Sequence, residues 1–153
     1  AERKPYLNVA RELLEEANPV KPHQKAFYER LSGRLAGHEN DTQNVVVHFD
    51  NAEQLFAPMS KEEYSTGSLQ SILSRVESAL WLDRHKNAQV ASDETLGIAI
   101  SELKLFLDEL SCVLDDAEIH INRLLDEYNT AVQNSDIKSA HTSIERLIGF
   151  LEG

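Results

Sequence analysis

Cysteine, proline and glycine are all scarce in this chain of 153 residues. Cys112 is the single cysteine, which excludes an internal disulfide and a metal site built from cysteines. None of the four prolines lies beyond Pro58, and there are only six glycines, so the C-terminal two-thirds contains few residues that end helices. The sequence therefore predicts an all-α fold with long helices.

Long apolar runs are also missing. No stretch approaches the ~20 apolar residues of a membrane span, and no signal peptide is visible. We therefore expect no membrane association and a reducing compartment, the cytoplasm, although a first residue of Ala1 rather than methionine is consistent with a processed chain. The 41% hydrophobic and 27% charged residues predict one domain, 1–153, with its own core.

Catalytic motifs are not found in the sequence. The six histidines are dispersed, and there is no HExxH pair, glycine-rich phosphate loop or GxSxG turn. Asp116 with His120, and His141 with Glu145, stand one helical turn apart, and each pair can give two ligands to a metal. A polar helix face explains both pairs more simply. We therefore expect no cofactor and no metal, with a metal-dependent hydrolase using these four residues as an alternative.

Apolar residues recur with a coiled-coil period between Ser92 and Gln133. Their spacing alternates between four and three residues, the 3.5-residue period of a helical seam. The seam consists of Leu96, Ile100, Leu103, Leu107, Leu110, Leu114, Ala117, Ile121, Leu124, Tyr128 and Ala131. Asp115 followed by Glu118 has the spacing of a helix start. The seam nevertheless runs through both residues in register, so the sequence predicts one uninterrupted helix over 92–133.

Short, mildly basic helices are predicted over residues 1–40. Asn18-Pro19 ends the first of them, and Gly37 is placed to cap the second. Their basic side chains are the natural complement to the acidic residues of the long helix, within one chain or between two. These side chains are Arg3, Lys4, Arg11, Lys21, Lys25, Arg30 and Arg34.

The middle helices are predicted over residues 43–86. Val45, Phe49 and Phe56 recur at helical spacing, which favours a helix over a short strand there. The following helix carries a row of small residues that either lets another backbone approach closely or forms a solvated face. This row consists of Gly67, Ser71, Ser74 and Ser78. A last helix over 136–152 folds back on the long helix, which completes a helical bundle organised on 92–133.

The net charge of −11 is unevenly distributed. Residues 93–127 contain ten acidic and two basic residues, for a charge of −8, whereas residues 1–40 contain six and seven, for +1. A negative field of this kind repels nucleic acid and anionic membranes, and it attracts basic protein surfaces. We therefore expect no direct binding to nucleic acid or membrane.

A second apolar stripe lies on the far side of the predicted long helix from its seam. Ile98, Leu105, Cys112 and Ile119 are spaced by seven residues and fall between two acidic rows. The acidic residues that we expect to contact a partner beside the stripe are Glu102, Asp108, Glu109, Asp115 and Asp116. The stripe is either ordinary core of a bundle or an interface, because an exposed apolar strip rimmed by charge marks a contact site.

These patterns predict a non-enzymatic protein-interaction module, such as an adaptor, an inhibitor or a chaperone-like binding protein. Its partner is expected to be a protein with a basic surface, or a second copy that forms a homodimer. A further alternative is a nucleic-acid mimic, whose rows of carboxylates would occupy the phosphate-binding surface of a DNA- or RNA-binding protein.

Overall fold

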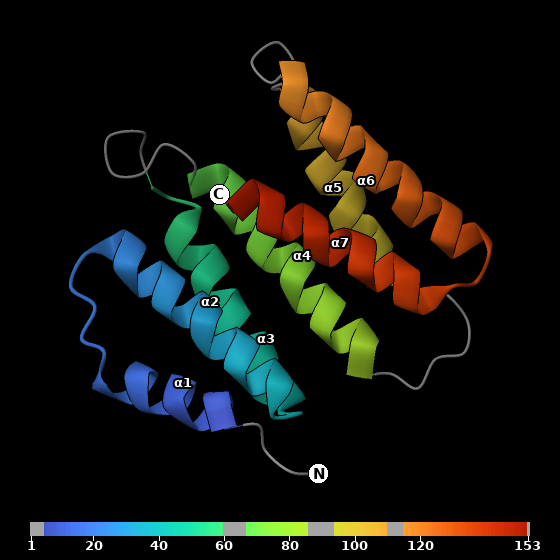
Figure 1. Cartoon of the computed structure of the whole chain (residues 1–153). Helices are drawn as coiled ribbons and strands as arrows, with labels where there is room; N and C mark the ends of the chain where they lie inside the picture. Colours follow the sequence, from blue (N-terminus) through green and yellow to red (C-terminus); the bar gives the residue numbers. More distant parts are fainter. Residues whose placement is uncertain (1–4, 60–66, 86–93, 110–114, 153) are drawn as a thin grey trace.

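The computed structural model describes residues 5–59, 67–85, 94–109 and 115–152. These ranges form helices only, and no strand occurs within them, which confirms the predicted all-α fold (Figure 1). The helices are α1 (Pro5–Glu16), α2 (Pro22–His38), α3 (Thr42–Phe56), α4 (Gly67–His85), α5 (Glu94–Glu109), α6 (Asp115–Gln133) and α7 (Ile137–Glu152).

Two tight helix–helix turns are set by local side chains. Asp41 accepts a hydrogen bond from the Asn44 amide at 3.2 Å and so caps α3, and Asp136 caps α7 through the Ser139 amide, also at 3.2 Å. Helix α2 does not end at Gly37 as expected, because it continues to His38. The left-handed residue of this turn is Asn40, with φ 61°.

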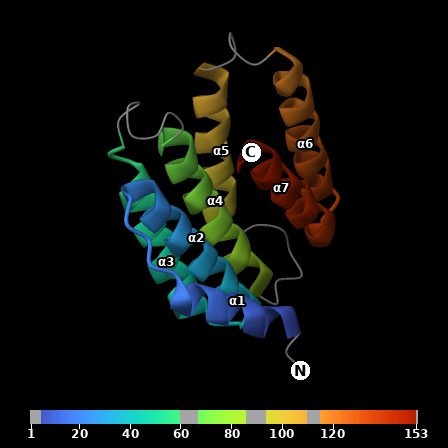
Figure 2. The ribbon, with the colours of Figure 1, turned by 60° about the vertical axis from the view of Figure 1, so that its left-hand side comes forward.

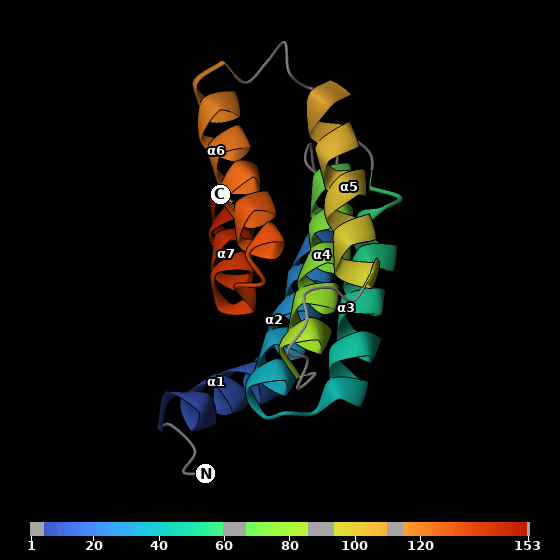
Figure 3. The ribbon, with the colours of Figure 1, turned by 90° about the vertical axis from the view of Figure 1, so that its right-hand side faces the viewer.

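The helices form two groups that share α4. Helices α2, α3 and α4 run up and down side by side, and α1 lies against the end of α2 that leads into α3 (Figure 2). Helices α4, α5, α6 and α7 form an up-and-down arrangement in which α7 packs on both α4 and α6 (Figures 1 and 3). Because α4 belongs to both groups, it lies at the centre of the molecule.

The structure does not confirm the single helix predicted over 92–133. Its described residues form α5 and α6, which run in opposite directions (Figure 3). The alternative helix start at Asp115 is the first residue of α6. Both helices bury their seam residues, and Leu103 of α5 and Leu124 of α6 belong to one apolar cluster. The seam therefore continues from one helix to the other without a change of spacing. A straight rod and a pair of facing antiparallel helices bury the same positions, so the heptad pattern does not distinguish them.

The larger apolar core, called here the C-terminal cluster, lies between α4, α5, α6 and α7. It contains the predicted seam residue Leu107, which is buried, whereas Leu110 lies outside the described residues. Its buried members are Leu73, Val76, Ala79, Leu80, Leu96, Ala99, Ile100, Leu103, Leu107, Ile121, Leu124, Leu125, Tyr128, Ala131, Ala140, Ile144, Leu147 and Ile148. The seam residues that the structure describes therefore contribute to one core, although one helix does not carry them all.

Small residues allow α2, α3 and α4 to pack closely. Ser71 and Ser74 of the predicted small-residue row are buried, and the Ser71 hydroxyl donates to the carbonyl of Glu53 in α3 at 3.1 Å. On α2, the backbone of Gly37 lies directly against the Trp81 ring of α4. These serines are thus packed against neighbouring helices and do not form a solvated face.

We expect Gly37→Ala to lower the free energy of unfolding by about 1–3 kcal/mol. A Cβ atom at this position would lie 2.5 Å from the Trp81 ring, so α2 or the ring must move. Gly97→Ala is the matched control, because its Cβ atom meets nothing within 4 Å and alanine favours a helix by about 0.5–1 kcal/mol. Urea denaturation of both variants measures the difference, and equal effects would contradict the close packing of α2 on Trp81.

Candidate interaction surface

Two large apolar side chains are exposed on the outer face of α5. Ile98 and Leu105 are seven residues apart, which places them on the same side of the helix, and they are 59% and 67% exposed. The opposite face of α5, with Leu103 and Leu107, is buried in the C-terminal cluster. Helix α5 lies at the edge of the molecule beside α4 (Figure 3). The predicted stripe is thus exposed on this helix and is not part of the core.

Acidic side chains accompany this apolar pair. Asp108 is exposed, and Glu102 forms an ion pair with Arg75 of α4. Arg75 also bonds Glu53 of α3 at 2.5 Å. This hydrogen bond is the largest of the causes that raise the pKa of Arg75 above its ordinary value. Glu102 is therefore partly neutralised by its own chain. The side chains of Glu109, Asp115 and Asp116 lie outside the part of the structure that is described.

The other members of the predicted stripe do not continue along α5. Ile119 belongs to α6 and is 73% exposed. It lies at a wide groove of about 1050 Å³ between α6 and α7, which Arg123, Asp126 and Arg146 also line. Cys112 lies outside the described ranges. Because α5 and α6 are antiparallel, the residues spaced by seven are divided between two helices.

Two of the basic residues expected to complement the acidic segment, Arg30 and Arg34, are directed to α4 instead of α5. Arg30 of α2 is 1% exposed and donates to the Gln70 carbonyl and the Ser74 hydroxyl of α4, at 2.7 and 2.9 Å. Arg34 bonds both carboxylate oxygens of Glu77 at 2.6 and 2.8 Å. These arginines thus join α2 to α4, a role that the sequence analysis missed. The polar, small-residue face of α4 was the available signal.

The described side chains of the hydrolase alternative, those of His120, His141 and Glu145, do not converge. His141 pairs with Asp83 of α4, and Glu145 pairs with Arg84 at 2.6 Å. His120 packs against the Phe150 ring, which is nine residues along α7 from His141, or ~13 Å at the helical rise. Within the described ranges, no group of three or more histidine, cysteine, aspartate or glutamate side chains is placed to hold a metal ion.

A buried histidine–carboxylate pair connects α7 to α4. The Nε2 atom of His141 and the Oδ2 atom of Asp83 are 2.5 Å apart, and both side chains are buried. Burial, and then the nearby Asp83 charge, raise the pKa of Tyr128 above its ordinary value. Neither His141 nor Asp83 lines the α6–α7 groove, so the pair is a structural contact between helices rather than a base facing that surface.

Trp81 stands beside a second, smaller cavity of about 260 Å³ between α2, α4 and α7. The Arg84 guanidinium lies over its ring, 5.4 Å from the centroid, and the His85 ring stacks on it at 6.1 Å. Both arginines of this cavity bond carboxylates within it: Arg84 bonds Glu145, and Arg34 bonds Glu77. Both arginines of this cavity are therefore already paired within the chain.

Comparisons with models of known protein families, with curated proteins and with solved structures gave no match. None of the helices that the structure describes is long and apolar enough to cross a membrane. The exposed apolar pair of α5, with its acidic neighbours, is the candidate interaction surface of the described chain.

Proposed function

We propose that this protein is a non-enzymatic interaction module that binds a basic protein partner through the outer face of α5. The observation that carries the proposal is the exposure of Ile98 and Leu105 on one side of a helix whose other side is firmly buried. Two branched apolar side chains at heptad spacing can enter a groove or pack against a helix of a partner. This surface suits an adaptor, an inhibitor or a chaperone-like protein.

The charge of the segment favours a basic partner over a second copy of this chain. Helix α5, residues 94–109, contains four acidic residues and one basic residue, for a charge of −3, and Asp108 is exposed beside the apolar pair. Two such faces brought together repel one another, whereas a basic rim on a partner is attracted. Two of the basic side chains expected to relieve this repulsion in a dimer, Arg30 and Arg34, are engaged between α2 and α4.

The two other functional interpretations have less support. A nucleic-acid mimic requires rows of free carboxylates, but Glu102 in one predicted row is paired with Arg75. A metal-dependent hydrolase requires ligands that converge, but His120 and His141 contact different partners. The salt dependence of partner binding distinguishes a nucleic-acid mimic from an apolar adaptor. An ionic strength of about 1 M shortens the electrostatic screening length to about 3 Å, so it abolishes binding that depends on charge alone.

The double variant Ile98→Glu, Leu105→Glu is expected to lose partner binding by at least tenfold, about 1.4 kcal/mol. Both new charges would have to be buried at the interface, whereas in the free chain they remain in solvent. The measurement is quantitative capture of the host partner on immobilised protein, repeated with the purified partner. Thermal unfolding should be nearly unchanged, because both positions are exposed.

Ile119→Glu, at an equally exposed position on α6, is the matched control and should bind as the parent does. Light scattering of the free protein gives the oligomeric state in the same experiment. Unchanged binding by the double variant would refute the α5 surface. A parent dimer that the double variant dissociates would identify a second copy, and not a basic partner, as the occupant.

A further inference from the structure

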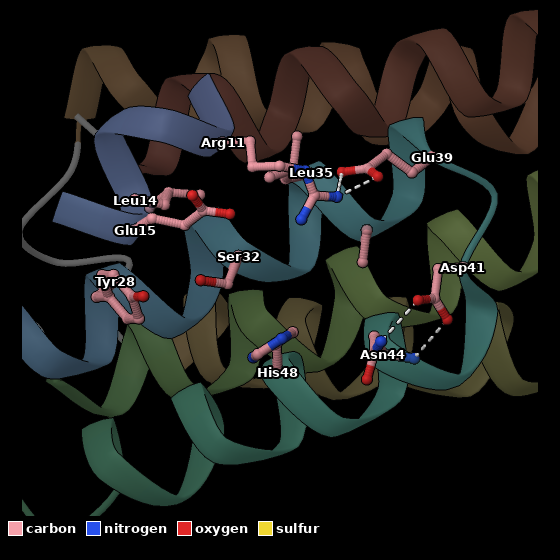
Figure 4. A pocket seen from close by; sticks show the side chains of 11 residues that line it. Arg11, Leu14, Glu15, Tyr28, Ser32, Leu35, Glu39, Asp41, Asn44 and His48 are labelled. Atoms are coloured by element: carbon pink, nitrogen blue, oxygen red, sulfur yellow. Dashed lines mark hydrogen bonds and ion pairs between the residues drawn. The ribbon is translucent and has the colours of Figure 1, made fainter. Parts of the chain in front are cut away.

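Helix α1 lies beside a polar cavity of about 230 Å³ formed with α2 and α3 (Figure 4). Three carboxylates, those of Glu15, Glu39 and Asp41, and one guanidinium, that of Arg11, line it. These four side chains sum to a charge of −2, so the cavity favours a cation. Asp41 is committed to capping α3 through Asn44, which leaves Glu15 and Glu39 as the carboxylates that can bind one.

Glu39 already binds a guanidinium group. The Nη2 atom of Arg11 donates to both oxygens of the Glu39 carboxylate (Figure 4). The Glu39 side chain is only 10% exposed, whereas that of Arg11 is 43% exposed. The hydrogen bond to Glu39 is the main cause that raises the pKa of Arg11 above its ordinary value. A largely buried carboxylate needs a cation beside it, and here the cation is supplied from the solvent side.

The helix that carries Arg11 is weakly attached to the rest of the described chain. Among the described helices, α1 packs against α2 alone. Two of its described apolar side chains, Val9 and Leu13, are 55% and 63% exposed, so these two contribute little burial to its attachment. Exchange of Arg11 for another guanidinium would keep the Glu39 ion pair and would leave the C-terminal cluster intact. The cost of displacing Arg11 is therefore confined to α1.

We propose that this cavity is a guanidinium-binding site in which Arg11 is a displaceable resident occupant. The incoming group is an alkylguanidinium, brought by a small molecule or by an arginine side chain of a partner. Its N–H groups would bond the carboxylates of Glu39 and Glu15, and the hydroxyls of Tyr28 and Ser32 also line the cavity as acceptors. The site lies on α1, α2 and α3 and does not involve α5. A negative result for one proposal therefore leaves the other unaffected.

The test is a calorimetric titration with ethylguanidinium, made on the parent and on Arg11→Ala. Tethered Arg11 competes with the ligand, and a site that it leaves open about one tenth of the time binds about tenfold more tightly once Arg11 is removed. We therefore expect Arg11→Ala to tighten binding about tenfold. Arg11→Lys keeps a cation on α1 and should bind with intermediate affinity. Arg123→Ala, which removes a cation from the α6–α7 groove instead, should bind as the parent does.

Adding Glu39→Gln to Arg11→Ala should abolish the gained binding, because the neutral amide no longer pairs with the guanidinium. A capped peptide with one arginine among alanines identifies the source: binding as tight as that of ethylguanidinium indicates a partner's arginine, and a large preference for ethylguanidinium indicates a small molecule. The proposal is overturned if Arg11→Ala binds no more tightly than the parent, or if the Glu39→Gln double variant still binds.

Discussion

Leu103→Ala is expected to lower the free energy of unfolding by about 2–5 kcal/mol. Leu103 is fully buried in the C-terminal cluster, between the helices that the predicted seam joins. Its truncation removes apolar contacts and leaves a cavity that α4 and α7, packed on each other, cannot fully close. Urea denaturation at equilibrium measures the effect as a lower midpoint with an unchanged slope.

Leu105→Ala is the matched control, because it makes the same chemical change two residues away on the same helix. Leu105 is 67% exposed, so its loss should change stability by no more than about 0.5 kcal/mol. A Leu105→Ala variant as unstable as Leu103→Ala would mean that the outer face of α5 is buried in solution. The pair therefore tests both the fold and the exposure on which the α5 proposal depends.

Arg30→Ala is expected to cost about 3 kcal/mol, which is large for a polar residue. The buried guanidinium bonds the side chain and the carbonyl of Gln70 and the hydroxyl of Ser74. It also lies 4.9 Å from the centroid of the Phe56 ring. Alanine leaves the buried side-chain oxygen of Gln70 without this donor and opens a cavity between α2 and α4. The measurement is again urea denaturation.

Arg75→Ala provides the comparison, because Arg75 also bonds two neighbouring helices but is 45% exposed. Exposed ion pairs contribute little, so this variant should lose at most about 1 kcal/mol. An equal loss of unfolding free energy in the two variants would show that the burial of Arg30 does not strengthen the contribution of its hydrogen bonds.

Local pattern was sufficient to predict a helix such as α3. Val45, Phe49 and Phe56 fall on one face of α3, and all are buried, as helical spacing predicted. What local pattern could not supply was the direction of the chain after α5. The apolar seam passes through Asp115 without a change of phase, and both a rod and two antiparallel helices satisfy it. The packing of α5 on α4, and of α6 on α7, distinguishes them.

The candidate surfaces were predictable to different degrees. Exposure of Ile98 and Leu105 could be proposed from their position opposite the seam, and the structure places both in solvent. The contact between Arg11 and Glu39 could not be foreseen, because it joins residues 28 positions apart through the angle at which α1 meets α2. Charge alone suggested that the N-terminal arginines complement the acidic segment, but burial directs Arg30 to α4 instead.

Helix α4 packs in both groups of helices, so each group depends on it. One face of α4 supplies Leu73, Val76 and Leu80 to the C-terminal cluster, while Gln70 and Ser74 hold Arg30 of α2. A fragment that ends before α4 would leave α2 and α3 without their third neighbour, and one that begins after α4 would expose the apolar faces of α5 and α7. We therefore expect that neither fragment folds alone, and that expression of either half of this chain yields no folded protein.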